Sequence, residues 1–148
     1  MSSALVTIEN LNKSYGRGPV LQSLNLTVNS GRIVGVMGPN GCGKTTLFKI
    51  LTGLISDYQG TVTIDGQAPG VYTKSIVSYL PEKTYLSDWM RAKDALDMFR
   101  DFYADFDRQK AAEMLQRFRL DEKMKLKSMS KGMQEKLQLI LVMSRAAK

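Results

Sequence analysis

The sequence contains no histidine and a single cysteine among its 148 residues. Without histidine the chain has neither an imidazole acid or base nor a histidine-ligated metal. One cysteine cannot form a disulfide within the chain, which is typical of a protein in a reducing compartment. No apolar run approaches the ~20 residues that a membrane-spanning helix needs. These absences favour a globular protein whose chemistry depends on other side chains.

The charge of the chain is unevenly distributed. The net charge is +7, yet residues 1–107 hold ten Lys/Arg and ten Asp/Glu, whereas residues 108–148 hold eleven and four. A basic segment of this kind fits either an anionic surface, such as nucleic acid or membrane, or a solvated helical face. We favour the solvated face. The length suits one domain with a core of its own.

The most specific feature is an eight-residue segment that fits G-x-x-x-x-G-K-[ST], the phosphate-binding P-loop. Residues 32–37 before it are expected to form a buried parallel strand, and residues 46–51 after it a helix that ends near Gly53. In this setting the loop N–H groups bind an anion, Lys44 reaches the β- and γ-phosphates, and the Thr45 hydroxyl ligates Mg²⁺. The predicted nucleotide-binding residues of this loop are Gly38, Pro39, Asn40, Gly41, Cys42, Gly43, Lys44, Thr45 and Thr46.

The remaining elements follow from hydrophobic periodicity and turn signals. Strands are expected at 6–8, as an edge strand, and at 24–28, 62–64 and 75–80, with a tight turn at Asp65-Gly66. From residue 88 the pattern is helical, with Asp107 as the N-cap of one helix. Ser130 is expected to cap a further helix that extends to Met143. Its side chains are apolar on nearly all sides, which predicts a buried helix.

Segments on both sides of the loop carry a family resemblance. Upstream are LNKSYG at 11–16 and VLQSLNLTV at 20–28, and downstream are LFKILTGL at 47–54 and GTVTIDG at 60–66. Their order resembles the nucleotide-binding domain of ABC transporters. The resemblance implies an α/β P-loop NTPase core with a mixed sheet of antiparallel and parallel strands, an inserted α-helical subdomain, and ATP and Mg²⁺ as ligands. The implied segments are a partial nucleotide-binding core at 1–85, a helical subdomain at 86–128, and a signature segment with its helix at 129–148.

The resemblance also assigns roles outside the P-loop. In the family, an aromatic residue at the position of Tyr15 stacks on adenine. The alternative is that Tyr15 is an ordinary loop tyrosine. Glu82 falls at the Q-loop, where the family has a glutamine near the metal; a carboxylate there could bind Mg²⁺, or could simply be solvated. The family signature, usually Leu-Ser-Gly-Gly-Gln, caps the γ-phosphate of ATP held by a partner protomer. Its slot here is occupied by Ser130, Lys131, Gly132 and Met133, of which Lys131 and Met133 depart from the pattern.

The partners implied by the resemblance are a transmembrane permease subunit and a second ATP-binding protomer, with no direct contact to nucleic acid. The protein would then lie peripherally at the cytoplasmic face of a membrane. Tyr85, Leu86 and Trp89 open the helical subdomain. They are either core residues or part of the groove that receives a transporter's coupling helix, and the sequence leaves both interpretations open.

Several family motifs do not occur in this sequence. In the family the signature helix leads into an apolar strand that ends in Asp-Glu, followed by a D-loop and a histidine switch, and these 148 residues contain none of the three. We therefore expect an incomplete domain that binds ATP without hydrolysing it unaided. The alternatives are a soluble ABC-type ATPase fragment that acts on ribosomes or nucleic acid, and a non-catalytic interaction fragment.

Overall fold

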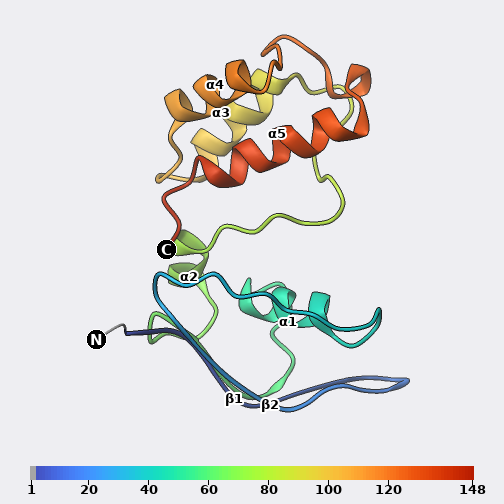
Figure 1. The fold of residues 1–148 in the computed structure, drawn as a ribbon, viewed down its shortest axis with the longest axis vertical. Coiled ribbons are helices and arrows are strands. Elements are labelled where there is room, and N and C mark those ends of the chain that lie inside the picture. Colours follow the sequence, from blue (N-terminus) through green and yellow to red (C-terminus); the bar gives the residue numbers. More distant parts are fainter. Residues whose placement is uncertain (1–2) are drawn as a thin grey trace. The chain divides into compact units, whose positions relative to one another are not determined.

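The computed structural model describes residues 3–148, which divide into two compact units (Figure 1). One unit extends to Val77 and includes Lys148, and the other comprises Ser78 to Ala147. The first combines strands and helices and the second is helical, so the expected α/β class is confirmed. The finer boundaries expected at 85 and 128 stay a prediction.

The sheet of the first unit consists of three antiparallel strands in the order β2-β1-β3. They are β1 (Ala4–Tyr15), β2 (Gly18–Asn29) and β3 (Gln59–Ile64). The expectation of an edge strand at 6–8 is wrong, because Thr7 of β1 pairs with β2 on one side and with β3 on the other. The predicted turn at Asp65-Gly66 is confirmed by positive φ at both residues and by an Ile64–Gln67 bridge.

The long β1–β2 hairpin is irregular near its middle. Its register shifts between Ile8 and Leu11, and Ser23 there has a φ of 45°. Asparagine side chains replace the ladder hydrogen bonds that this irregularity removes: Asn25 Oδ1 accepts from Asn10 N at 2.9 Å, and Asn12 Oδ1 accepts from Ser23 N at 2.8 Å. The strands therefore remain paired across the bulge, because these two backbone donors have side-chain partners.

One helix covers this sheet. Helix α1 (Lys44–Leu51) buries Leu47 and Ile50 against Ile8, Leu11 and other apolar residues of the strands. As expected, Gly53 ends the helix: its φ is 70° and its N–H donates to Ile50 O. The core between α1 and the hairpin fixes where the helix begins, and so where the loop before it lies.

Two of the expected strands are not formed: the parallel strand at 32–37 and the strand at 75–80. Residues 32–37 have no strand pairing, and Ile33 is fully exposed. Of residues 75–80, the first two end helix α2 (Val71–Ile76), in which Gly70 N donates to Thr73 Oγ1 at 2.8 Å, and 77–80 have no strand pairing. A buried parallel strand needs a hydrogen-bonding neighbour, whereas a helix satisfies its backbone internally. Both sides of β1 are already paired, and residues 3–148 offer no further strand beside either segment.

The second unit packs its helices around one apolar core. These are α3 (Ala92–Phe102), α4 (Arg108–Arg117), the short 3₁₀ helix η1 (Leu126–Ser128) and α5 (Lys131–Met143). The core includes Leu96, Leu115 and Leu137, one from each of the three longer helices. Both predicted N-caps are confirmed: Asp107 accepts from Lys110 N at 2.9 Å and Ser130 from Met133 N at 3.2 Å.

The core of the second unit generates a stability prediction. Leu115→Ala should lower the free energy of unfolding of this unit by about 2–5 kcal/mol, because it leaves a cavity among fully buried neighbours. Phe102→Ala is the matched control, since Phe102 lies at the end of α3 with its side chain 78% exposed. Urea titration followed by circular dichroism measures both. Equal losses for the two variants would contradict the assigned core.

Candidate nucleotide site

The P-loop turns sharply before α1. Cys42 N donates to Pro39 O at 3.3 Å, and Gly43 is the N-cap of the helix with a φ of 98°. Its carbonyl accepts from Leu47 N at 2.9 Å, which closes the first helical turn. A residue with a side chain rarely adopts the Gly43 conformation. The second glycine of the motif is therefore required by the backbone.

The Lys44 side chain folds back over the loop. Its Nζ donates to Gly38 O at 2.5 Å and to Pro39 O at 2.8 Å, and it lies 3.6 Å from Cys42 Sγ. The loop thus surrounds the ammonium group with its own carbonyl oxygens. These contacts hold the cation at the centre of the loop, where the motif places a phosphate-binding lysine.

The β1–β2 hairpin supports the loop at Gly43. A Cβ at this position would lie 2.8 Å from Leu21 Cδ2 and 2.9 Å from Val20 O, both on β2. Real Cβ contacts are not that short, so the absence of a side chain lets the loop approach the strand. The hairpin and the loop therefore form one contiguous structure within the first unit (Figure 1).

The start of α1 is open to an anion. Within the described residues no side chain caps this helix, and its first turn holds no acidic residue. Thr45 is exposed and Thr46 half-buried at the same end. Unpaired N–H groups at a helix start favour a negatively charged ligand, and a hydroxyl oxygen suits Mg²⁺. The residues present therefore fit a metal-bound phosphate group.

Tyr15 is the last residue of β1, close to the strand region that supports the loop. It pairs with Gly18 across the hairpin, its ring is 46% exposed, and Lys13 Nζ lies 4.9 Å from the ring centroid. The structure therefore brings together the predicted phosphate and adenine residues in one unit. Sequence reasoning missed Lys13, whose only signal was its spacing of two residues from Tyr15 on the same strand face.

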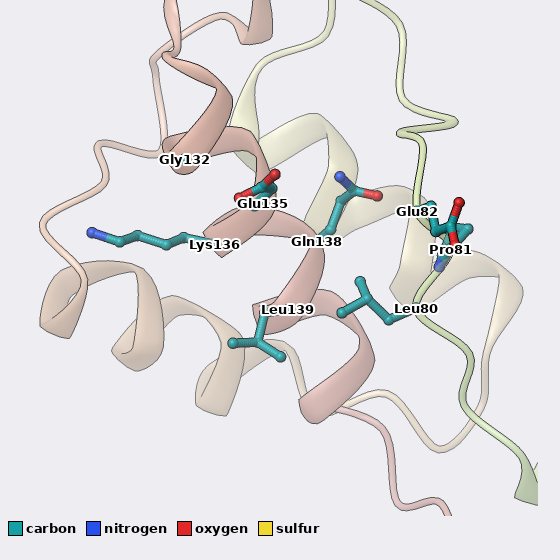
Figure 2. A pocket seen from close by; sticks show the side chains of 8 residues that line it. All are labelled: Leu80, Pro81, Glu82, Gly132, Glu135, Lys136, Gln138 and Leu139. Carbon is teal, nitrogen blue, oxygen red and sulfur yellow. The ribbon is translucent and has the colours of Figure 1, made fainter. Parts of the chain in front are cut away.

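Glu82 and the signature segment belong to the second unit. Glu82 and Gly132 line a common cavity of about 630 Å³, together with Leu80, Leu139 and Gln138 (Figure 2). Gln138 is buried on α5, and its Oε1 is without a hydrogen-bond partner among residues 3–148. Sequence reasoning treated Gln138 as part of an apolar helix and missed it, because a lone amide in such a run carries no distinguishing signal.

The signature residues surround the start of α5. Ser130 and Lys131 are exposed, and Lys131 Nζ lies 3.9 Å from Glu135 Oε1 in a surface pair of little energetic consequence. A Cβ at Gly132 would have no atom within 4 Å. The segment is therefore exposed, but unlike the start of α1 it is capped by a side chain, the Ser130 hydroxyl, and its role stays a prediction.

The large apolar and aromatic residues Tyr85, Leu86 and Trp89 differ in environment. Leu86 is a core residue, whereas Trp89 is mostly exposed. Tyr85 stacks on Phe99 with ring centroids 6.2 Å apart. Burial, and then the neighbouring Tyr103, raise the pKa of the Tyr85 hydroxyl above its ordinary value. Of the two interpretations left open by the sequence, the core one holds for Leu86.

Comparison with protein families identifies the chain. Residues 21–148 match the family model for ABC transporters. The chain belongs to the ABC transporter family. Its sequence motifs agree with the family's ATP-binding component, and no helix among the described residues 3–148 has both the length and the apolar character to span a membrane.

Individual ABC proteins are similar over most of this chain. The ABC transporter ATP-binding protein YtrB of Bacillus subtilis is 30% identical over 141 residues, which cover 93% of this chain and 48% of that protein. The lipopolysaccharide export system ATP-binding protein LptB of Haemophilus influenzae is 34% identical over 126 residues, covering 79% and 52%. The chain thus spans about half the length of these relatives.

Solved structures show the same fold. The structure of a putative ABC transporter ATP-binding protein from Pyrococcus furiosus superposes with a TM-score of 0.81 and 27% identity, covering 97% of this chain and 72% of that one. This agreement extends over both compact units. The expected fold class is therefore confirmed by the family and by the structural likeness.

The contact between Gly43 and β2 generates a prediction. Gly43→Ala should weaken nucleotide binding, because the methyl group pushes the loop off Leu21 and the φ of 98° adds strain of about 1–3 kcal/mol. Gly35→Ala is the control, since a Cβ there meets nothing within 4 Å. Calorimetric titration with Mg·ATP compares the two variants. Wild-type affinity in Gly43→Ala would show that the loop does not depend on this approach.

Proposed function

We propose that the chain is the nucleotide-binding part of an ATP-binding subunit of an ABC transporter and binds Mg·ATP through its P-loop. The observation that carries the proposal is the position of the Lys44 ammonium, held inside the loop by Gly38 O and Pro39 O. A cation in a ring of backbone groups, next to an open helix start, fits a polyphosphate better than any other common ligand.

Binding would exchange the contacts of Lys44. In the structure its Nζ donates to two neutral carbonyl oxygens of the loop. A phosphate oxygen is a charged acceptor, and charge-assisted hydrogen bonds are roughly twice as strong as neutral ones. Replacing the carbonyl contacts by phosphate contacts is therefore favourable, and it requires little movement of the lysine. The carbonyl contacts keep the cation in place before the nucleotide arrives, which reduces the ordering cost of binding.

The other groups of the site have complementary roles in this proposal. The N–H groups at the start of α1 hold phosphate oxygens, and the Thr45 hydroxyl ligates Mg²⁺. The bound metal neutralises phosphate charge and fixes the triphosphate conformation. Tyr15 stacks on the adenine ring, and such stacking contributes about 1–3 kcal/mol without reading the base by hydrogen bonds.

The second unit supplies the remaining roles. We assign Glu82 to the Q-loop position near the metal, and Ser130 to Met133 to the γ-phosphate of a nucleotide held by a second protomer. A transmembrane permease subunit completes the transporter, with this chain at the cytoplasmic face of the membrane. The assignment is supported by family membership and by relatives named as ATP-binding proteins of transport systems.

Removal of the P-loop cation tests the proposal. Lys44→Ala should weaken Mg·ATP binding roughly 10- to 150-fold, since a hydrogen bond to a charged group contributes about 1.5–3 kcal/mol. Lys49→Ala is the matched control: it removes the same charge from the last turn of the same helix. Titration of a fluorescent ATP analogue measures both. If Lys44→Ala binds as well as Lys49→Ala, the loop is not the nucleotide site.

A further inference from the structure

Lys13 occupies an unusual position for a lysine. Its side chain is only 7% exposed, although lysine is almost never buried unless it is paired. It stands on β1 opposite Leu21, and its Nζ emerges beside Tyr15, 4.9 Å from the ring centroid. Residues two apart on a strand share one face, so the backbone itself places the ammonium against the ring.

The acidic partner of Lys13 does not explain this placement. Asp57 Oδ2 lies 3.0 Å from Lys13 Nζ, but the Asp57 side chain is 98% exposed. The pair is only part-buried, and the surrounding water screens its solvated carboxylate and weakens the attraction. The buried stem of Lys13 therefore fixes its position, and a methionine would pack there equally well. The charge at the end of the stem calls for another explanation, which the ring contact provides.

The same register connects Lys13 to the phosphate loop. Leu21, its partner across the hairpin, is the residue that a Cβ at Gly43 would strike. Tyr15 lies two residues further along β1, a distance of about 7 Å along the strand. Lys13 thus lies between Leu21, which supports the P-loop, and the exposed ring of Tyr15.

From this geometry we propose that Lys13 is a positioning residue for the base-stacking ring of Tyr15. Its ammonium covers one face of the ring by a cation–π contact, which holds the ring still and leaves the opposite face for adenine. The inference rests on the proposed binding of ATP. It adds a residue that acts through Tyr15 and touches neither base nor phosphate.

Paired ligands and a double-mutant cycle test the inference. Mg·ATP has base and phosphates, whereas Mg·tripolyphosphate has phosphates alone, and calorimetry gives the affinity for each. Lys13→Met keeps the stem and should weaken Mg·ATP about three- to tenfold while leaving Mg·tripolyphosphate unchanged. Lys13→Arg should bind as the wild type does, because a guanidinium also stacks on an aromatic face.

The double-mutant cycle with Tyr15→Ala tests whether Lys13 acts through the Tyr15 ring. In that background Lys13→Met should have no further effect on Mg·ATP. Asp57→Asn is the control for the neighbouring ion pair and should change little. Lys13→Gln repeats the test with a polar stem if Lys13→Met does not fold, as judged by circular dichroism.

Three results would overturn the inference. If Lys13→Met lowers the affinity for Mg·tripolyphosphate as much as that for Mg·ATP, Lys13 is a phosphate ligand. If it lowers the Mg·ATP affinity by the same factor in the Tyr15→Ala background, Lys13 acts independently of the ring. If Lys13→Met and Lys13→Gln both bind Mg·ATP as the wild type does, Lys13 has no role in binding. Failure of the proposed function looks different, because neither ligand would then bind the wild-type protein.

Discussion

The close approach of Gly43 to β2 is the constraint on which the candidate site depends. The loop can rest on Leu21 and Val20 because no side chain stands between them. From this point α1 begins, and its buried face packs on the hairpin through Leu47 and Ile50. The position of the Lys44 ammonium follows from this arrangement. Lys44 is the first residue of α1, and its Nζ donates to Pro39 O inside the loop.

The same contact joins the two proposed binding functions, whose residues lie far apart in the sequence. Tyr15 and Gly43 belong to different elements, yet the pairing of β1 with β2 places the ring near the strand that supports the loop. A polyphosphate and a base need receptors of opposite character: a ring of N–H groups with a cation, and an apolar face. One hairpin that supports both would hold them at a fixed separation, which lowers the ordering cost of binding.

The sequence predicted local features well because local chemistry decides them. The N-caps Asp107 and Ser130, the Gly53 helix end and the Asp65-Gly66 turn need only their immediate neighbours. The predictions of strands at 32–37 and 75–80 were wrong because a strand depends on partners elsewhere in the chain. The sequence did not indicate Lys13 or Gln138 for a similar reason. The burial of the Lys13 side chain and the lack of a partner for Gln138 Oε1 both depend on tertiary packing.

Amide hydrogen exchange in the presence of Mg·ATP tests the central claim most directly, because it reports on the loop without any substitution. The account predicts that Mg·ATP, but not Mg²⁺ alone, slows the exchange of amides in residues 38–46, while the core of α3 is unchanged. Unaltered exchange in 38–46 at saturating nucleotide, or slowing confined to other segments, would contradict a nucleotide site built on the hairpin and its P-loop.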